Sequence, residues 1–151
     1  MTAPDVTRRP RPAARLLLLD SRDRLLLFRF TPPGAAPFWA TPGGAVDPGE
    51  DYAAAARREL REETGLTANV GPEVAQRWVA FDTIEGEPVV ADERYFLIRV
   101  GDVALSFDGH TALERAVMTD HLWWSRSALA ASSETIYPED IVALLARVTA
   151  G

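Results

Sequence analysis

The segment from residue 44 to residue 66, GAVDPGEDYAAAARRELREETGL, constrains the fold of this chain more than any other part. Its second half predicts a helix. Asp51 can cap the first turn, the body is rich in alanine and other strong helix formers, and Gly65 stands where a left-handed residue ends a helix. A narrow apolar stripe suited to packing on a sheet runs along this helix, formed by Ala53, Ala56 and Leu60.

Three glutamates share one side of the predicted helix. Glu59, Glu62 and Glu63 are related by i, i+3 and i+4, so they fall within a stripe about 100° wide. Like charges at this spacing repel each other, and anions near a helix C-terminus oppose the macrodipole, so stability alone would not favour them. A bound Mg²⁺ would, because it prefers carboxylate oxygens. The ordinary alternative is a solvated charged face, on which the acids pair with Arg57, Arg58 and Arg61.

The spacing of the whole segment favours a site over a charged surface. Gly44 is followed after five residues by Glu50, and Glu50 after seven residues by the run RELREETGL at 58–66. This arrangement resembles the signature box of the Nudix hydrolase family, which includes the MutT-like enzymes, at every specified position. A chance match to so many fixed residues is on the order of 10⁻⁸ per starting position.

The resemblance implies a role for each acid in the box. Glu59 and Glu63 would be the main ligands of catalytic Mg²⁺, for which Mn²⁺ can substitute, and Glu62 a further ligand or the base that activates water. A backbone carbonyl near the double glycine, at Gly43, would help to hold the metal. In the family pattern an ion pair between Arg58 and Glu50 orients the catalytic helix.

Outside the box, the general base has several candidates. Nudix enzymes resemble one another in the box and differ elsewhere, so the resemblance does not choose among them. The candidates are Glu93 and Glu114, followed by His110 and His121; for each, an ordinary surface or hydrogen-bonded side chain is the simpler alternative.

Arginine and aromatic side chains in strand-like segments are candidates for substrate contacts. Arg29, Arg77 and Arg94 could meet phosphates, although arginines on exposed strand faces need no such role. A base could stack on an aromatic ring, although rings in strands usually belong to the core. The stacking candidates are Trp39 and Phe81, together with Trp78, Tyr95, Trp123 and Trp124. About 16 positions past the box, some Nudix subfamilies carry a proline for ADP-ribose or a tyrosine for dinucleoside polyphosphates. Residues 81–84 contain neither, which lowers the weight of both substrates.

The remainder of the chain predicts one domain with an α/β fold. Residues 1–14 are rich in proline and arginine and predict a flexible tail, which leaves 15–151 as a single domain. The predicted elements are a hairpin at 15–19 and 24–30, strands within 70–83 and 89–100 around a turn at 84–87, a capping box at 111–114, a strand at 121–124, a helical turn at 125–131 and a helix at 138–148. The resemblance implies a Nudix α/β/α sandwich with a mixed central sheet and a loop-helix-loop catalytic box.

Composition limits the partners. The net charge of −6 argues against general nucleic-acid binding, so the expected partner is a small nucleotide, with a homodimer left open. No stretch approaches the length of a transmembrane helix, and the apolar run after Arg8-Arg9 is too short for an export signal. The chain has no cysteine, and we therefore expect a cytoplasmic protein.

The expected function is Mg²⁺-dependent hydrolysis of a phosphoanhydride bond in a nucleoside diphosphate linked to another group. The leading substrates are nucleoside triphosphates, including oxidised ones, so the enzyme would be a nucleotide pyrophosphatase. ADP-ribose or another diphosphate sugar is the alternative substrate. A Nudix-fold module that binds a nucleotide without turning it over is the alternative function, disfavoured because all four box glutamates are present. An isomerase is disfavoured by the absence of cysteine.

Overall fold

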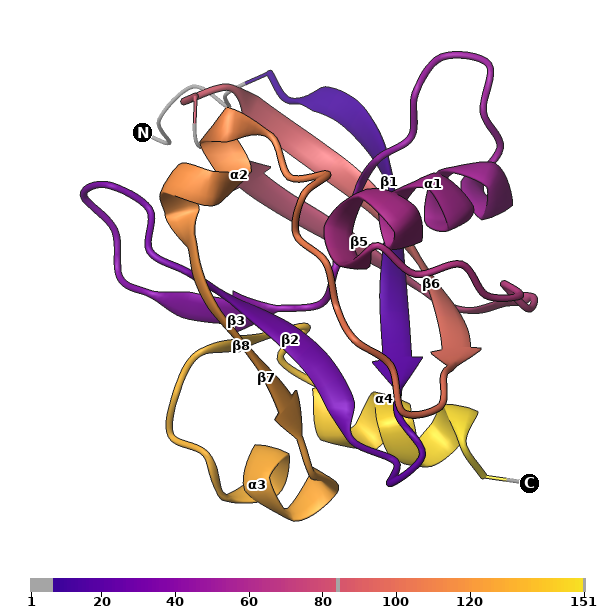
Figure 1. Ribbon diagram of the computed structural model, residues 1–151. Coiled ribbons are helices and arrows are strands. Elements are labelled where there is room, and N and C mark those ends of the chain that lie inside the picture. The colour runs from indigo at the N-terminus through magenta and orange to yellow at the C-terminus, as the bar shows by residue number, and fades with distance from the viewer. Residues whose placement is uncertain (1–6, 84, 151) are drawn as a thin grey trace.

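A run of four leucines at 16–19 makes β1 the central strand, since each leucine is fully buried between two layers. The computed structural model describes residues 7–83 and 85–150 (Figure 1). Its eight-stranded sheet has the order β5-β6-β1-β2-β3-β8, with β4 paired to β1 and β7 paired to β2. The strands are β1 Arg9–Leu19, β2 Leu25–Phe30, β3 Phe38–Ala40, β4 Gly43–Ala45, β5 Glu73–Asp82, β6 Pro88–Arg99, β7 Met118–Trp124 and β8 Ile136–Tyr137. The helices are α1 Tyr52–Thr64, α2 Ala112–Val117, α3 Arg126–Ala131 and α4 Ile141–Val148.

The sheet is mixed, and helices cover both faces. β1 runs parallel to β6 over its whole length and antiparallel to β2 and β4. One apolar cluster joins α1 to the face that carries Leu16, Leu18 and Phe96. A second joins α3 and α4 to the opposite face, which carries Leu17 and Leu19. Figure 1 shows α1 lying across β1 and β6. The predicted α/β/α sandwich with a mixed central sheet is therefore confirmed.

On one side of β1 the neighbouring strand changes along its length. Residues 13–15 pair with β4, whereas Leu19 pairs with Leu25 at the start of β2. The amide of Leu16 donates to the carbonyl of Pro42 (2.9 Å), which closes the step between the two partners. The loop after β3 is thereby brought against β1, next to the start of the box.

The helix of the box has the predicted limits. The Asp51 side chain accepts a hydrogen bond from the Ala54 amide, and Gly65 ends the helix with a φ of 74°. The buried apolar stripe differs slightly from the prediction: it consists of Ala55, Ala56 and Leu60, whereas Ala53 is only partly buried.

Two predicted boundaries were wrong. Residues 9–14 are not a tail but the first half of β1, paired with 89–94 of β6. The Pro12 carbonyl accepts a hydrogen bond from the Val46 amide, on the side of β1 that faces away from β6. The N–H group that Pro12 lacks would point to that same side, so the proline does not interrupt the pairing with β6. The last helix begins at Ile141 rather than Pro138, because Tyr137 is held extended by pairing with Ala40 of β3.

The other predicted elements agree with the structure. β5 and β6 form the second hairpin, and both bonds of the capping box join Thr111 and Glu114 at the start of α2. The strand at 121–124 lies within β7, and the helical turn at 125–131 contains α3. Ile84, the first residue of the predicted turn, lies outside the described residues. No helix in the described part of the chain has the length and apolar character needed to cross a membrane.

The packing of α1 on the sheet gives a stability prediction. Leu60 is 1% exposed within the cluster beneath α1, so Leu60→Ala should lower the free energy of unfolding by about 2–5 kcal/mol. Leu113→Ala, at a residue 42% exposed in α2, should change it by less than about 0.5 kcal/mol. Urea denaturation of both variants measures the difference, and equal losses would contradict the assigned core.

Candidate active site

The Arg58 guanidinium joins the two halves of the box. Its Nε and Nη2 donate to the carboxylate of Glu50 at 2.8 and 2.9 Å, and Nη2 also donates to the carbonyl of Ala45 at 2.8 Å. Its Nη1 donates to Glu59 Oε1 at 2.9 Å and to Glu62 Oε2 at 3.0 Å. The hydrogen bonds from Arg58 lower the pKa of Glu50 to about 2. The pair expected between Arg58 and Glu50 is therefore present, and the same side chain also orders two of the acids.

Glu59 lies against the glycine that begins the box. The Glu59 side chain is buried in α1, and a Cβ at Gly44 would lie 2.5 Å from its Oε1. No larger residue fits at position 44 without moving this carboxylate. Gly43 precedes Gly44 in β4 and pairs with Arg15 of β1. The double glycine thus lies beside Glu59 of α1 through Gly44.

Glu63 is the most buried acid of the box, at 3% exposure. Burial, together with the neighbouring Glu114 and Glu59, raises the pKa of Glu63 to about 10. Burial opposes ionisation of Glu114, but hydrogen bonds from Glu63 and Thr111 lower the pKa of Glu114 overall. The two carboxyl groups therefore share a proton that stays on Glu63. The α2 helix thus brings one predicted base candidate, Glu114, into contact with the box.

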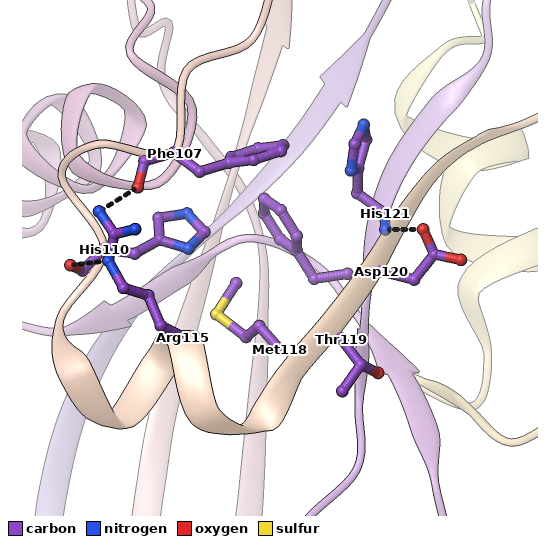
Figure 2. Close-up of a pocket in the computed structure, with 8 residues that line it drawn as sticks. Phe107, His110, Arg115, Met118, Thr119, Asp120 and His121 are labelled. Atoms are coloured by element: carbon purple, nitrogen blue, oxygen red, sulfur yellow. Dashed lines mark hydrogen bonds between the residues drawn. The ribbon is translucent and has the colours of Figure 1, made fainter.

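His110 supports the end of α1. Its Nε2 donates to the backbone carbonyl of Glu63 at 2.7 Å and lies 3.5 Å from Glu63 Oε2. His110 lines a small hollow of about 370 Å³. Figure 2 shows Phe107 beside His110 and His121 across the hollow. Of the two histidine candidates, only His110 contacts a box acid within the described structure.

The carboxylates suit a divalent cation. Glu63 Oε2 is buried and has no hydrogen-bond partner among the described residues, although the Glu63 carboxyl group shares its proton with Glu114. Glu59 and Glu114 place further carboxyl oxygens beside it. Within those residues, no three acidic or histidine side chains surround a common point, because Arg58 draws Glu59 and Glu62 toward itself. Glu62 is 44% exposed and so is accessible from solvent. The donor set is all oxygen, which matches Mg²⁺ or Mn²⁺.

A large cavity of about 990 Å³ opens on the face of the sheet opposite α1. Arg15 and Glu93 meet at its floor in a buried ion pair, with 2.6 Å between Nε and Oε2. Arg77 lines the cavity and pairs with Asp140 at 2.6 Å, and Phe81 also lines it. The cavity therefore combines aromatic rings with a few charged side chains, as small-molecule pockets commonly do.

Several predicted contacts lie outside the large cavity. Trp39 is 5% exposed and packs on Trp124 in the core. Arg94 projects from the α1 face, over the ring of Tyr52 and paired with Asp92. Arg29 lies in β2 opposite Trp39 and does not line the large cavity. The predicted contacts that do line the cavity are Arg77, Trp78, Phe81 and Tyr95.

Arg15 and Arg11 were not among the site residues predicted from the sequence. Both lie on β1, where arginines at positions 11 and 15 interrupt the apolar residues on one face of the strand. That period-two spacing was the available signal, but the prolines at 10 and 12 made the segment resemble a tail.

Comparisons of the sequence and of the fold with known proteins agree with the box and the mixed sheet described above. Residues 9–143 match the NUDIX domain family. A MutT protein from Methanosarcina mazei superposes with a TM-score of 0.64 at 23% identity, covering 95% of each chain. A MutT NUDIX hydrolase from Burkholderia pseudomallei superposes with a TM-score of 0.65 at 23% identity, covering 94% of this chain and all of that one. At this level of identity the similarity establishes the fold.

Curated relatives resemble only part of the chain. An RNA pyrophosphohydrolase from Brucella ovis is 49% identical over 49 residues, which are 32% of this chain and 28% of that protein. An RNA pyrophosphohydrolase from Roseobacter denitrificans is 34% identical over 85 residues, which are 54% of this chain and 52% of that protein. The chain thus spans from about a quarter to about half the length of these relatives.

The close approach at Gly44 gives a prediction about metal binding. Gly44→Ala should displace Glu59 and weaken Mg²⁺ binding by about 10- to 100-fold, as changes beside a metal ligand do. Gly101→Ala, where an added Cβ meets nothing within 4 Å, is the matched control. Calorimetric titration with Mg²⁺ compares them, and unchanged affinity in Gly44→Ala would refute the placement of Glu59.

The raised pKa of Glu63 gives a prediction about pH. In metal-free protein the folded state keeps a proton on Glu63 up to about pH 10, whereas the unfolded chain loses it near its ordinary pKa of about 4.3. Between these values the folded state binds more protons, so its stability falls by up to about 1.4 kcal/mol per pH unit as pH rises. Glu63→Gln should remove this slope. Urea denaturation in chelator at several pH values measures it, and parallel profiles would contradict the assignment.

Proposed function

The chain belongs to the Nudix family, and we propose that it is a Mg²⁺-dependent hydrolase that cleaves a phosphoanhydride bond of a nucleotide. The observation that carries the proposal is the buried oxygen of Glu63, next to Glu59 and Glu114, which has no hydrogen-bond partner in the part of the chain that the structure describes. A group of acids this close is costly without a cation, and a pyrophosphate group would meet a bound cation readily.

Each acid has a proposed role. Glu59 and Glu63, one turn apart in α1, would hold the metal, and Glu62 would add a ligand or accept the proton of the attacking water. The carbonyl of Gly43 is the proposed backbone ligand. Bound Mg²⁺ supplies charge neutralisation for the phosphates and lowers the pKa of water. Arg58, tied to Glu50, keeps Glu59 and Glu62 in register with the box loop.

Glu114 is the stronger base candidate outside the box. Its carboxylate accepts a hydrogen bond from Glu63, so it lies beside the proposed metal ligands. Glu93 accepts a hydrogen bond from Arg15 Nε at 2.6 Å and lines the large cavity instead. We therefore assign Glu93 to the cavity floor, where it fixes Arg15.

The leading substrates are nucleoside triphosphates, including oxidised ones. The large cavity offers Phe81 for stacking and Arg77 for polar contact, on the opposite face of the sheet from α1. Solved structures with the same fold include an Ap4A hydrolase from C. elegans and a UDP-X diphosphatase, so the fold accommodates several diphosphate compounds. The alternative substrates are ADP-ribose or another diphosphate sugar, and RNA, since the curated relatives are named RNA pyrophosphohydrolases.

A panel assay tests the proposal. Nucleoside triphosphates, diphosphate sugars and dinucleoside polyphosphates, together with a triphosphorylated oligonucleotide, are incubated with and without Mg²⁺, and released phosphate and nucleotide are measured. Glu63→Gln should lower kcat by at least about 100-fold, because it removes a charged metal ligand. Glu134→Gln, at an exposed glutamate between α3 and β8, is the control. Nucleotide binding without turnover of any compound would favour the non-catalytic module instead.

A further inference from the structure

Arg11 lies over the ring of Phe81, a residue that lines the large cavity, and pairs with no carboxylate among the described residues. Residues 11 and 15 project from the same face of β1, because side chains alternate along a strand. Arg15 lines the cavity, and the Arg11 guanidinium carbon lies 5.8 Å from the ring centroid of Phe81, which lines it too. Arg11 itself is partly exposed. An anion in the cavity can therefore approach this guanidinium.

The positive charge of Arg11 is not balanced by an ion pair among the described residues. Its Nη1 is buried and has no hydrogen-bond partner among the described residues. The nearest acid on this face, Glu93, is already bound to Arg15 at 2.6 Å. Burial, followed by repulsion from Arg15, lowers the pKa of Arg11, while attraction to Glu93 and Glu59 opposes this. Two arginines and one carboxylate leave one positive charge, and a buried donor without an acceptor is costly.

The neighbouring arginines show that carboxylate partners are available along this strand. Arg9, on the same face and two residues away, is 59% exposed and forms an ion pair with Glu87. Arg8 pairs with Asp82 at 3.2 Å. Arg11 differs from both because the residues beside it, Val79 and Ala91, are apolar. The Nη1 donor of Arg11, which has no partner among the described residues, is therefore better explained by a ligand than by a general excess of arginine.

We propose that Arg11 binds a substrate phosphate beyond the diphosphate held at the α1 acids, and so selects nucleoside polyphosphates over diphosphate sugars. The proposal rests on the hydrolase function proposed above. A diphosphate sugar has only the two phosphates that flank the cleaved bond, whereas a nucleoside triphosphate brings a third. A guanidinium donates to phosphate oxygens in a bidentate manner, which suits this position next to Phe81.

A binding experiment without metal tests the site itself. Inorganic tripolyphosphate is titrated calorimetrically into chelator-treated protein. Arg11→Ala should bind it about tenfold or more weakly than wild type, whereas Arg9→Ala, the matched control, should stay within about twofold. Equal binding by wild type and Arg11→Ala, or no binding by wild type, would overturn the proposal.

A kinetic experiment tests the selectivity. The ratio of kcat/KM for nucleoside triphosphates to kcat/KM for ADP-ribose should fall about tenfold or more in Arg11→Ala, mainly through KM, and Arg11→Lys should restore part of it. An unchanged ratio, or a wild type that prefers ADP-ribose, would refute the proposal. Absence of any Mg²⁺-dependent hydrolysis by wild type would refute the proposed function instead, and the tripolyphosphate titration would still judge Arg11.

Discussion

The hydrogen bonds of the Arg58 guanidinium hold the parts of the site together. It is 18% exposed and binds the loop through Glu50 and Ala45 and the helix through Glu59 and Glu62. A planar guanidinium fixes direction as well as distance, which a lysine at this position would not do. The loop and the helix of the box therefore behave as one rigid unit, and the acids keep their positions relative to the double glycine.

The buried acids oppose stability, and this cost indicates their purpose. Glu59 and Glu63 are each less than a tenth exposed, and burial raises the pKa of both. Placing α2 beside them adds a third carboxylate, Glu114, instead of a compensating cation. The hydrogen bond from His110 to the Glu63 carbonyl stabilises the last turn of α1 without neutralising these charges. Such an arrangement is stable to the extent that a metal ion or a shared proton offsets the repulsion.

β1 lies between the acids of α1 and the large cavity. One face of the strand, which carries Leu16 and Leu18, packs under α1, and Glu59 of that helix lies against Gly44 of β4. The other face carries Arg15, which meets Glu93 in the large cavity. The acids and the cavity therefore belong to opposite faces of the same strand.

Elements with local causes could be predicted from the amino-acid sequence alone. The caps at Asp51 and Gly65, the spacing of the acids and the apolar runs of β1 and β2 follow from propensity and periodicity, and the structure agrees with them. Which distant side chains meet depends on the folded chain as a whole. Glu114 reaches Glu63 because the segment before α2, through His110, packs against the end of α1. Arg15 reaches Glu93 because β1 lies parallel to β6. Strand order and register are set by the whole core rather than by any one segment, so the sequence alone did not reveal them.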